Sequence, residues 1–197
     1  MHAGPGAGKT LGALLSFKAM KKEGLLKSFV VFCHRNSIAS QWQKASEKLA
    51  LKVQEIGTYP NQQEISTESD GWILTYQGAT KQLQNSQEIL RIFSQKKLLA
   101  IADEAHHLGV NPDEQEGAIW GRTFSTLTDS SVLRLGLTGT PFRADNLAFC
   151  SANKILVKNA GEVLEQINPD LCVEPRALIS AGDVRPLEFH FQDIEVN

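Results

Sequence analysis

Four short runs of apolar residues recur along this chain of 197 residues, and they constrain its fold more than any other feature. The runs are Phe29–Cys33, Trp72–Tyr76, Leu98–Ala102 and Val132–Leu137. Each run is continuous rather than alternating, which is typical of a strand buried on both faces. The segments between the runs show helical spacing, as in the stripe Leu11, Leu14, Leu15 and the pair Ile38, Trp42. Strands that alternate with helices predict an α/β fold, a three-layer parallel sheet with helices on both faces.

Composition and charge exclude several classes of protein. Hydrophobic residues make up 42% and charged residues 21%, as in an ordinary globular protein. The net charge of −2 lacks the basic excess of a general nucleic-acid coat, so any nucleic-acid contact must be local. Three widely separated cysteines favour a reduced, intracellular and therefore cytoplasmic setting. No apolar run approaches the roughly 20 residues that span a bilayer, so we expect no membrane role.

A glycine-rich segment at residues 3–10, with the sequence A-G-P-G-A-G-K-T, predicts a phosphate-binding loop. Its backbone N–H groups and the positive end of the following helix would surround an anion. In such a loop Lys9 reaches the β and γ phosphates and Thr10 ligates Mg²⁺. The residues predicted to bind the nucleotide are Gly6, Ala7, Gly8, Lys9 and Thr10. The alternative is a glycine-rich turn with a solvated lysine.

Two carboxylates, Asp103 and Glu104, directly follow the run Leu98–Ala102, at the edge where α/β sheets place ligands. In phosphoryl transfer Asp103 would hold Mg²⁺, and Glu104 would orient or deprotonate the attacking water. The alternative is an acidic surface pair that caps a helix. The adjacent His106 and His107 make a poor tetrahedral zinc site, so we expect a hydrogen-bonding role for His106.

A third polar segment, L-T-G-T-P, follows the last apolar run and contains Thr138 and Thr140. Hydroxyls at a strand exit can bond to the acidic pair or to a γ-phosphate. We therefore predict that both threonines couple the state of the nucleotide to neighbouring elements.

Together these three segments resemble motifs I, II and III of superfamily 2 helicases and translocases, the DEAD/DEAH-box group, over nearly the whole chain. Residues 30–35, followed by Gln41 and Trp42, resemble motif Ia. The segments 140–143 and 184–186 are most similar to the branch of type III restriction motors and XPB- or UvsW-like DNA helicases. The resemblance implies a first RecA-like domain that uses ATP and Mg²⁺, and the catalytic residues that it implies are Lys9, Asp103, Glu104 and His106.

The same resemblance implies contacts with one nucleic-acid strand. DNA is the expected partner, and RNA is the alternative. The matching positions are Arg35, Asn36, Thr75, Tyr76 and Gln77. Such contacts go mostly to phosphates and are therefore indifferent to base sequence and sensitive to salt. The alternatives are a solvated side chain for Arg35 and a partly buried ring for Tyr76.

We predict two parts in the chain. Residues 1–158 would form the first RecA-like ATP-binding domain without its first strand, because only Met1 and His2 precede the loop. Residues 159–197 would form a tail or linker toward a second RecA-like domain of the same parent protein. That domain would supply an arginine worth about 10³ to 10⁵ in rate, so we expect very slow hydrolysis without it.

The predicted function is the ATP-binding half of a nucleic-acid-dependent ATPase, a DNA helicase or translocase. Two alternatives stay open. One is a truncated nucleotide-binding interaction module without motor activity, and the other is the motor part of a restriction enzyme.

Overall fold

A five-stranded sheet forms the centre of the computed structural model, which describes residues 1–4, 6–57, 65–66, 68–85, 87–109, 115–139, 153–159 and 162–182. In spatial order its strands are β3 (Val53–Glu55), β4 (Gly71–Thr75), β2 (Ser28–Cys33), β5 (Leu98–Asp103) and β6 (Leu133–Leu137). All neighbours pair in parallel. The predicted parallel α/β architecture is confirmed.

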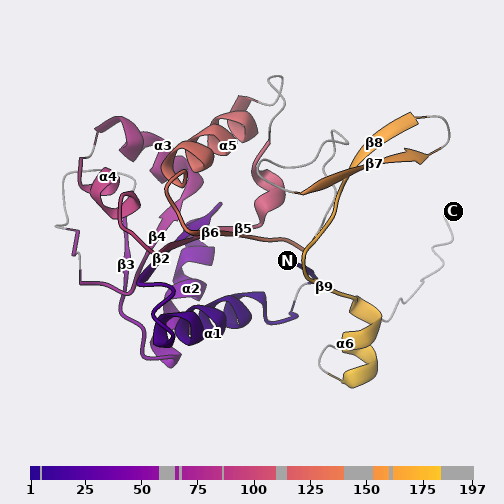
Figure 1. The fold of residues 1–197 in the computed structure, drawn as a ribbon, viewed down its shortest axis with the longest axis horizontal. Helices are drawn as coiled ribbons and strands as arrows, with labels where there is room; N and C mark the ends of the chain where they lie inside the picture. Colours follow the sequence, from indigo (N-terminus) through magenta and orange to yellow (C-terminus); the bar gives the residue numbers. More distant parts are fainter. Residues whose placement is uncertain are drawn as a thin grey trace, which may run out of the picture.

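Helices cover both faces of this sheet (Figure 1). One face carries α1 (Lys9–Lys22) and α2 (Asn36–Lys48), and the other carries α3 (Tyr76–Asn85), α4 (Gln87–Phe93) and α5 (Gln115–Leu127). Successive residues of a strand point to opposite faces, so Phe29 and Val31 of β2 join one buried cluster while Val30 and Phe32 join the other. Both faces of β2 are therefore apolar, which explains why its run in the sequence is continuous.

Two details of the predicted packing are wrong. In the run expected to be fully buried, Val132 is 64% exposed and Leu133 is 40% exposed, because β6 is the last strand of the five-stranded sheet. In α1 the buried residues are Ala13, Leu14 and Phe17, whereas Leu11 and Leu15 are exposed. The aromatic ring of Phe17 packs edge-on against Phe29, and this contact selects the buried face of the helix.

The strand expected to be absent before the glycine loop is present as a two-residue strand, β1 (His2–Ala3). The N–H of Ala3 donates to the Thr138 carbonyl at 3.1 Å, and the N–H of Thr138 donates to the Met1 carbonyl at 3.2 Å. On its other side β1 pairs in parallel with β9 (Cys172–Val173). This pairing fixes the start of the loop beside the end of β6.

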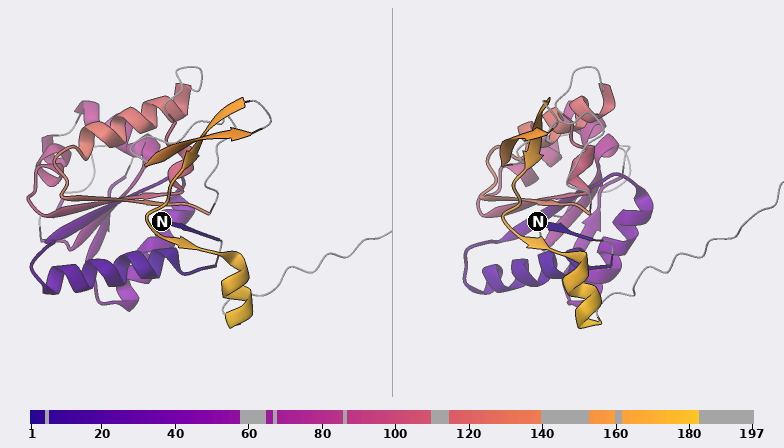
Figure 2. Two further views of the ribbon diagram at one scale, coloured as in Figure 1. Left: turned by 45° about the vertical axis from the view of Figure 1, so that its right-hand side comes forward. Right: turned by 90° about the vertical axis from the view of Figure 1, so that its right-hand side faces the viewer.

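The C-terminal part adds an antiparallel hairpin of β7 (Lys154–Asn159) and β8 (Glu162–Ile167), and then β9 and α6 (Pro175–Ala181). The hairpin projects from the body of the molecule (Figure 2) and contains residues on both sides of the predicted boundary after residue 158.

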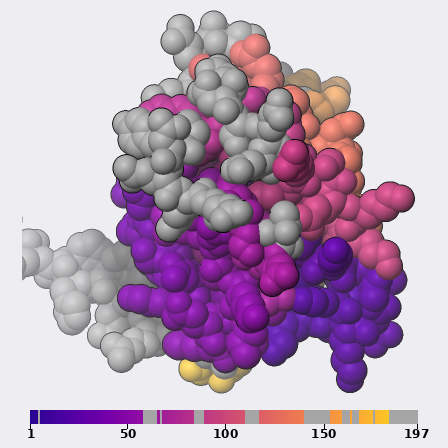
Figure 3. All heavy atoms as spheres, turned by 90° about the vertical axis from the view of Figure 1, so that its left-hand side faces the viewer, coloured from indigo at the N-terminus to yellow at the C-terminus, as the bar shows by residue number. Residues whose placement is uncertain are grey.

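The carboxyl ends of β2, β4, β5 and β6 meet at one edge of the sheet, since these strands are parallel. Figure 3 shows the opposite end of the molecule, where the first half of the chain, coloured indigo to magenta, forms most of the described surface. The segments predicted to bind ligands thus lie together, away from that face.

Candidate active site

The glycine-rich loop adopts the backbone that a phosphate site requires. Gly6 and Gly8 have positive φ angles of 78° and 73°, which glycine adopts without strain. Gly8 precedes the first turn of α1 and its carbonyl accepts from the N–H of Gly12 at 2.8 Å. No side chain of the described residues caps α1, and its first turn has no acidic residue. This helix end therefore fits a bound anion such as a phosphate.

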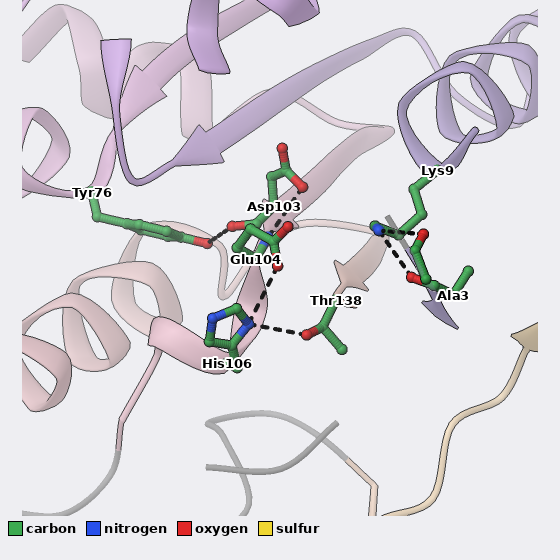
Figure 4. Close-up of polar contacts among 8 residues, drawn as sticks. Ala3, Lys9, Tyr76, Asp103, Glu104, His106 and Thr138 are labelled. Atoms are coloured by element: carbon green, nitrogen blue, oxygen red, sulfur yellow. Dashed lines mark hydrogen bonds and ion pairs between the residues drawn. The ribbon is translucent and has the colours of Figure 1, made fainter. Parts of the chain in front are cut away.

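Lys9 lies across the loop that precedes it. Its Nζ donates to the carbonyl oxygens of Ala3 at 2.9 Å and Gly4 at 3.2 Å (Figure 4). Both acceptors are neutral, and a charged acceptor such as a phosphate makes a stronger hydrogen bond with an ammonium group. The geometry thus keeps the Lys9 ammonium group at the loop, where its hydrogen bonds can pass from the carbonyls to an anionic ligand.

Asp103 ends the buried strand β5 and is only 7% exposed. Its Oδ2 accepts from the indole Nε1 of Trp42 at 2.7 Å, and its Oδ1 accepts from the N–H of Glu104 at 3.1 Å. Burial raises the pKa of the Asp103 carboxyl above its ordinary value, while the Trp42 bond and the charge of Lys9 act in the opposite direction. The fold therefore holds an acid in a place that disfavours its charge.

Tyr76 also supports the end of β5. Its hydroxyl donates to the backbone carbonyl of Asp103 at 2.9 Å, and its ring lies in stacked orientation against Phe32 and Trp120. Because α3 begins at Tyr76 directly after β4, the ring enters the core and is only 1% exposed. The prediction that this side chain contacts nucleic acid is wrong for this structure, in which it anchors Asp103 instead.

Glu104 and His106 connect β5 to the end of β6. Glu104 has a positive φ of 50°, an uncommon backbone for a residue with a side chain. It precedes the short 3₁₀ helix η1 (Ala105–His107), in which Nδ1 of His106 lies 3.3 Å from Oε2 of Glu104. The same nitrogen lies 3.0 Å from Oγ1 of Thr138 (Figure 4). The structure thus brings together three of the predicted site residues, and Thr140 lies outside the described residues.

The positions predicted to contact nucleic acid divide into two groups. Arg35, Asn36 and Gln77 are exposed after the ends of β2 and β4. Arg35 occupies the N-cap position of α2, and no side chain of the described residues caps that helix. Thr75 Oγ1 accepts from the N–H of Gly78 at 3.0 Å, so it caps the start of α3.

Magnesium fits the chemistry of these groups. It prefers oxygen ligands and needs only one or two carboxylates, because it keeps several of its waters. Asp103, Glu104 and the hydroxyl of Thr10 are ligands of this kind. Among the described residues no group of three histidine, cysteine or acidic side chains could hold a metal ion by itself.

Across the same part of the chain no helix has the length and apolar character needed to cross a membrane.

The bond from Trp42 to Asp103 is the contact that sequence reasoning missed. The sequence shows Trp42 next to Gln41 at a helical position, which predicts burial but no polar partner. Tryptophan has one N–H donor that usually finds an acceptor when buried. A tryptophan at a buried helical position therefore indicates a nearby acceptor, although it does not identify it.

Comparisons with known proteins agree with the fold. Residues 1–143 match the family described as type III restriction enzyme, res subunit. Similar curated proteins are an uncharacterized protein of Mycobacterium tuberculosis (strain CDC 1551 / Oshkosh), 28% identical over 145 residues, and one of Mycobacterium leprae (strain TN), 29% identical over 147 residues. Each match covers 73% of this chain and 22% of the relative, so the chain spans about a fifth of the length of the curated relatives it matches.

Two solved structures share the fold of this chain. The Sulfolobus solfataricus SWI2/SNF2 ATPase core in complex with dsDNA is 24% identical, with a TM-score of 0.54 and coverage of 71% of this chain and 27% of that chain. The core domain of the Sulfolobus solfataricus SWI2/SNF2 ATPase is 23% identical, with a TM-score of 0.50 and coverage of 71% and 26%.

Proposed function

Because this chain belongs to the type III restriction enzyme res subunit family, which consists of helicase-like ATPases, we propose that it is the ATP-binding half of a DNA helicase or translocase. The observation that supports this proposal most is that a phosphate-type loop and an acidic pair lie at the same edge of the sheet. The loop is the glycine-rich segment with its uncapped helix and Lys9, and the acidic pair is Asp103 and Glu104.

The residues at this edge divide the work of phosphoryl transfer. The N–H groups at residues 6–10 and the Lys9 ammonium bind the phosphates of ATP. Thr10 and Asp103 would hold Mg²⁺, and the two hydrogen bonds to Asp103 fix its carboxylate. When bound, the metal ion neutralises charge that develops on the phosphates.

Glu104 orients the attacking water and accepts its proton. Its side chain is 31% exposed, so water can reach it, whereas Asp103 is buried. His106 lies beside the Glu104 carboxylate and beside Thr138, so a shift at either group changes the position of the other. This contact makes Thr138 a coupling residue between the ATP site and the end of β6.

DNA is the proposed polymer. The SWI2/SNF2 core that shares this fold was solved in complex with dsDNA. In this chain Arg35 and Asn36 are exposed after β2, the neighbour of β5, and Gln77 is exposed after β4, the neighbour of β2. With a net charge of −2, binding should be local and weakened by salt.

The test is ATP hydrolysis measured with the protein in excess over ATP, so that slow chemistry is detected. Single-stranded DNA, duplex DNA and RNA are compared for the wild type and for Glu104→Gln. We expect low basal hydrolysis that DNA stimulates, and loss of about 10² to 10⁴ in rate when the proposed base is removed. Equal rates in the two proteins would contradict the role of Glu104. Mg²⁺-dependent ATP binding without stimulation by any polymer would favour a nucleotide-binding module.

The description of the matching family favours a narrower second candidate, the motor part of a restriction enzyme. ATP-dependent cleavage of duplex DNA by the protein would support this candidate. ATP-dependent turnover that leaves the DNA intact would support a helicase or translocase.

A further inference from the structure

Trp42 makes a buried contact with the ATP site although it lies on a covering helix. The side chain is 0% exposed, within α2, and its Nε1 donates to Oδ2 of Asp103 at 2.7 Å. We propose that Trp42 is a positioning residue, which holds the Asp103 carboxylate in the orientation that takes the Mg²⁺ of bound ATP. This inference rests on the proposed function and adds a residue to it.

Two donors from different elements fix the plane of the carboxylate. Trp42 reaches Oδ2 from α2, and the N–H of Glu104 reaches Oδ1 from the start of η1. A carboxylate has about four lone-pair sites on its two oxygens, so each oxygen can accept one more partner while it keeps its present donor. The last side-chain torsion of aspartate is otherwise broad. The Trp42 bond therefore removes rotational freedom without blocking a metal ion.

A substitution can separate the packing of the indole ring from its hydrogen bond. The ring belongs to the buried cluster under α1 and α2, which also contains Phe29 and Ile101. A phenylalanine at position 42 would keep most of this apolar contact and lose only the N–H donor. A purely structural role predicts a loss of stability from that change, whereas a positioning role predicts a change in the affinity for the metal ion.

The chain offers a matched control in Trp72. It is also 0% exposed and its Nε1 donates to a neutral acceptor, the Ser66 carbonyl, at 3.2 Å. It lies in the other buried cluster, near the start of β4. Trp72→Phe therefore removes the same atoms as Trp42→Phe from an equally buried side chain. Trp72 lies near the start of its strand, whereas the candidate site lies at the carboxyl ends of the strands.

The experiment measures the binding of a fluorescent ATP analogue to the full chain over a series of Mg²⁺ concentrations. Partners of metal ligands typically contribute 10- to 100-fold to metal affinity. We expect Trp42→Phe to raise the Mg²⁺ concentration for half-maximal binding about tenfold or more. Its affinity for the analogue in EDTA should equal that of the wild type, and Trp72→Phe should behave like the wild type throughout.

A second measurement needs no variant at position 42. The chain has three tryptophans, and the indole ¹H–¹⁵N signal of Trp42 should move when Mg²⁺ is added to the ATP-bound protein, while that of Trp72 should not. A stationary Trp42 signal would overturn the proposal, as would a Mg²⁺ dependence that is unchanged in Trp42→Phe or equally shifted in Trp72→Phe. Failure of the wild type to bind ATP in a Mg²⁺-dependent way would instead contradict the proposed function.

Discussion

The two halves of the proposed ATP site differ in how they are held. On the acidic side, Asp103 is buried, and Trp42, Tyr76 and the Glu104 N–H all donate to it. On the loop side, an added Cβ at Gly6 or Gly8 would meet nothing within 4 Å. There the side chain of Lys9 donates only to the backbone carbonyls of Ala3 and Gly4, in the same loop.

This difference indicates where each half gets its geometry. The acidic side is arranged by the hydrophobic core before any ligand binds, so its geometry depends on side chains that lie in both buried clusters. The loop side depends on backbone conformation and on the charge of Lys9, which only backbone carbonyls hold. Removal of the loop side chain Lys9 should therefore change mainly ligand affinity, whereas substitutions at Asp103 should change both ligand affinity and stability.

Among the substitutions that test this contrast between the two halves, Lys9→Ala should have the largest effect. A hydrogen bond to a charged group contributes about 1.5–3 kcal/mol, which corresponds to a loss of about 10- to 100-fold in ATP affinity. The unfolding free energy should fall by about 1 kcal/mol, because the variant loses the hydrogen bonds from Nζ to the carbonyls of Ala3 and Gly4. Calorimetric titration with ATP and chemical denaturation check the two values.

Lys18→Ala is the control for this prediction. Lys18 lies on the same helix, and its Nζ donates to the carbonyl of Leu49 at 2.8 Å, away from the loop. This variant should bind ATP as the wild type does. An equal loss of affinity in both variants would mean that general charge, rather than the position of Lys9, attracts the nucleotide.

Asp103→Asn should have an effect of intermediate size. It should change the stability of the fold, and the change should depend on pH. The folded state raises the pKa of Asp103 above its ordinary value of 3.8. Between these two values the folded protein binds more protons than the unfolded protein, so wild-type stability falls as pH rises through this window. Asparagine cannot titrate, so the difference between the unfolding temperatures of variant and wild type should change in favour of the variant as the pH rises from 3.8 through the raised pKa.

Thermal unfolding without Mg²⁺ measures this gain, and each kcal/mol corresponds to about 2–4 °C for a chain of this size. A constant difference between variant and wild type at all pH values would show that burial does not disfavour the charge of Asp103. It would also remove the contrast between the two halves of the site.

The smallest effects are expected for a pair of glycine substitutions with opposite signs. Gly8→Ala places a side chain at a positive φ of 73°, which costs about 1–2 kcal/mol. Gly12→Ala, in the interior of α1 with nothing within 4 Å of the new Cβ, should stabilise by about 0.5–1 kcal/mol. Chemical denaturation of both variants checks the signs. Equal signs would contradict the conformational role of Gly8.

The sequence predicts the sheet better than it predicts the faces of the helices. Continuous apolar runs mark β2 and β5, because a strand that is buried on both faces has few positions where a polar residue is tolerated. In α1 several apolar stripes are compatible with helical spacing, and the contact between Phe17 and Phe29 decides among them. That contact joins residues from two elements and has no local signature.

The candidate site shows the same limit. Lys9, Asp103 and Glu104 follow from motifs, because their spacing from a loop or a strand is local. The burial of Tyr76 and the bond between Trp42 and Asp103 depend on how helices cover the sheet. Pairs of residues so far apart in the chain cannot be matched from periodicity alone.

The central claim is that the loop and the acidic pair bind one ligand together. The most direct measurement is a crystal structure of the chain with a slowly hydrolysed ATP analogue and Mn²⁺, which anomalous scattering locates. We predict phosphates at the N–H groups of residues 6–10 and Mn²⁺ bound by Thr10 and Asp103. A nucleotide bound elsewhere, or a metal ion that contacts neither residue, would contradict the account.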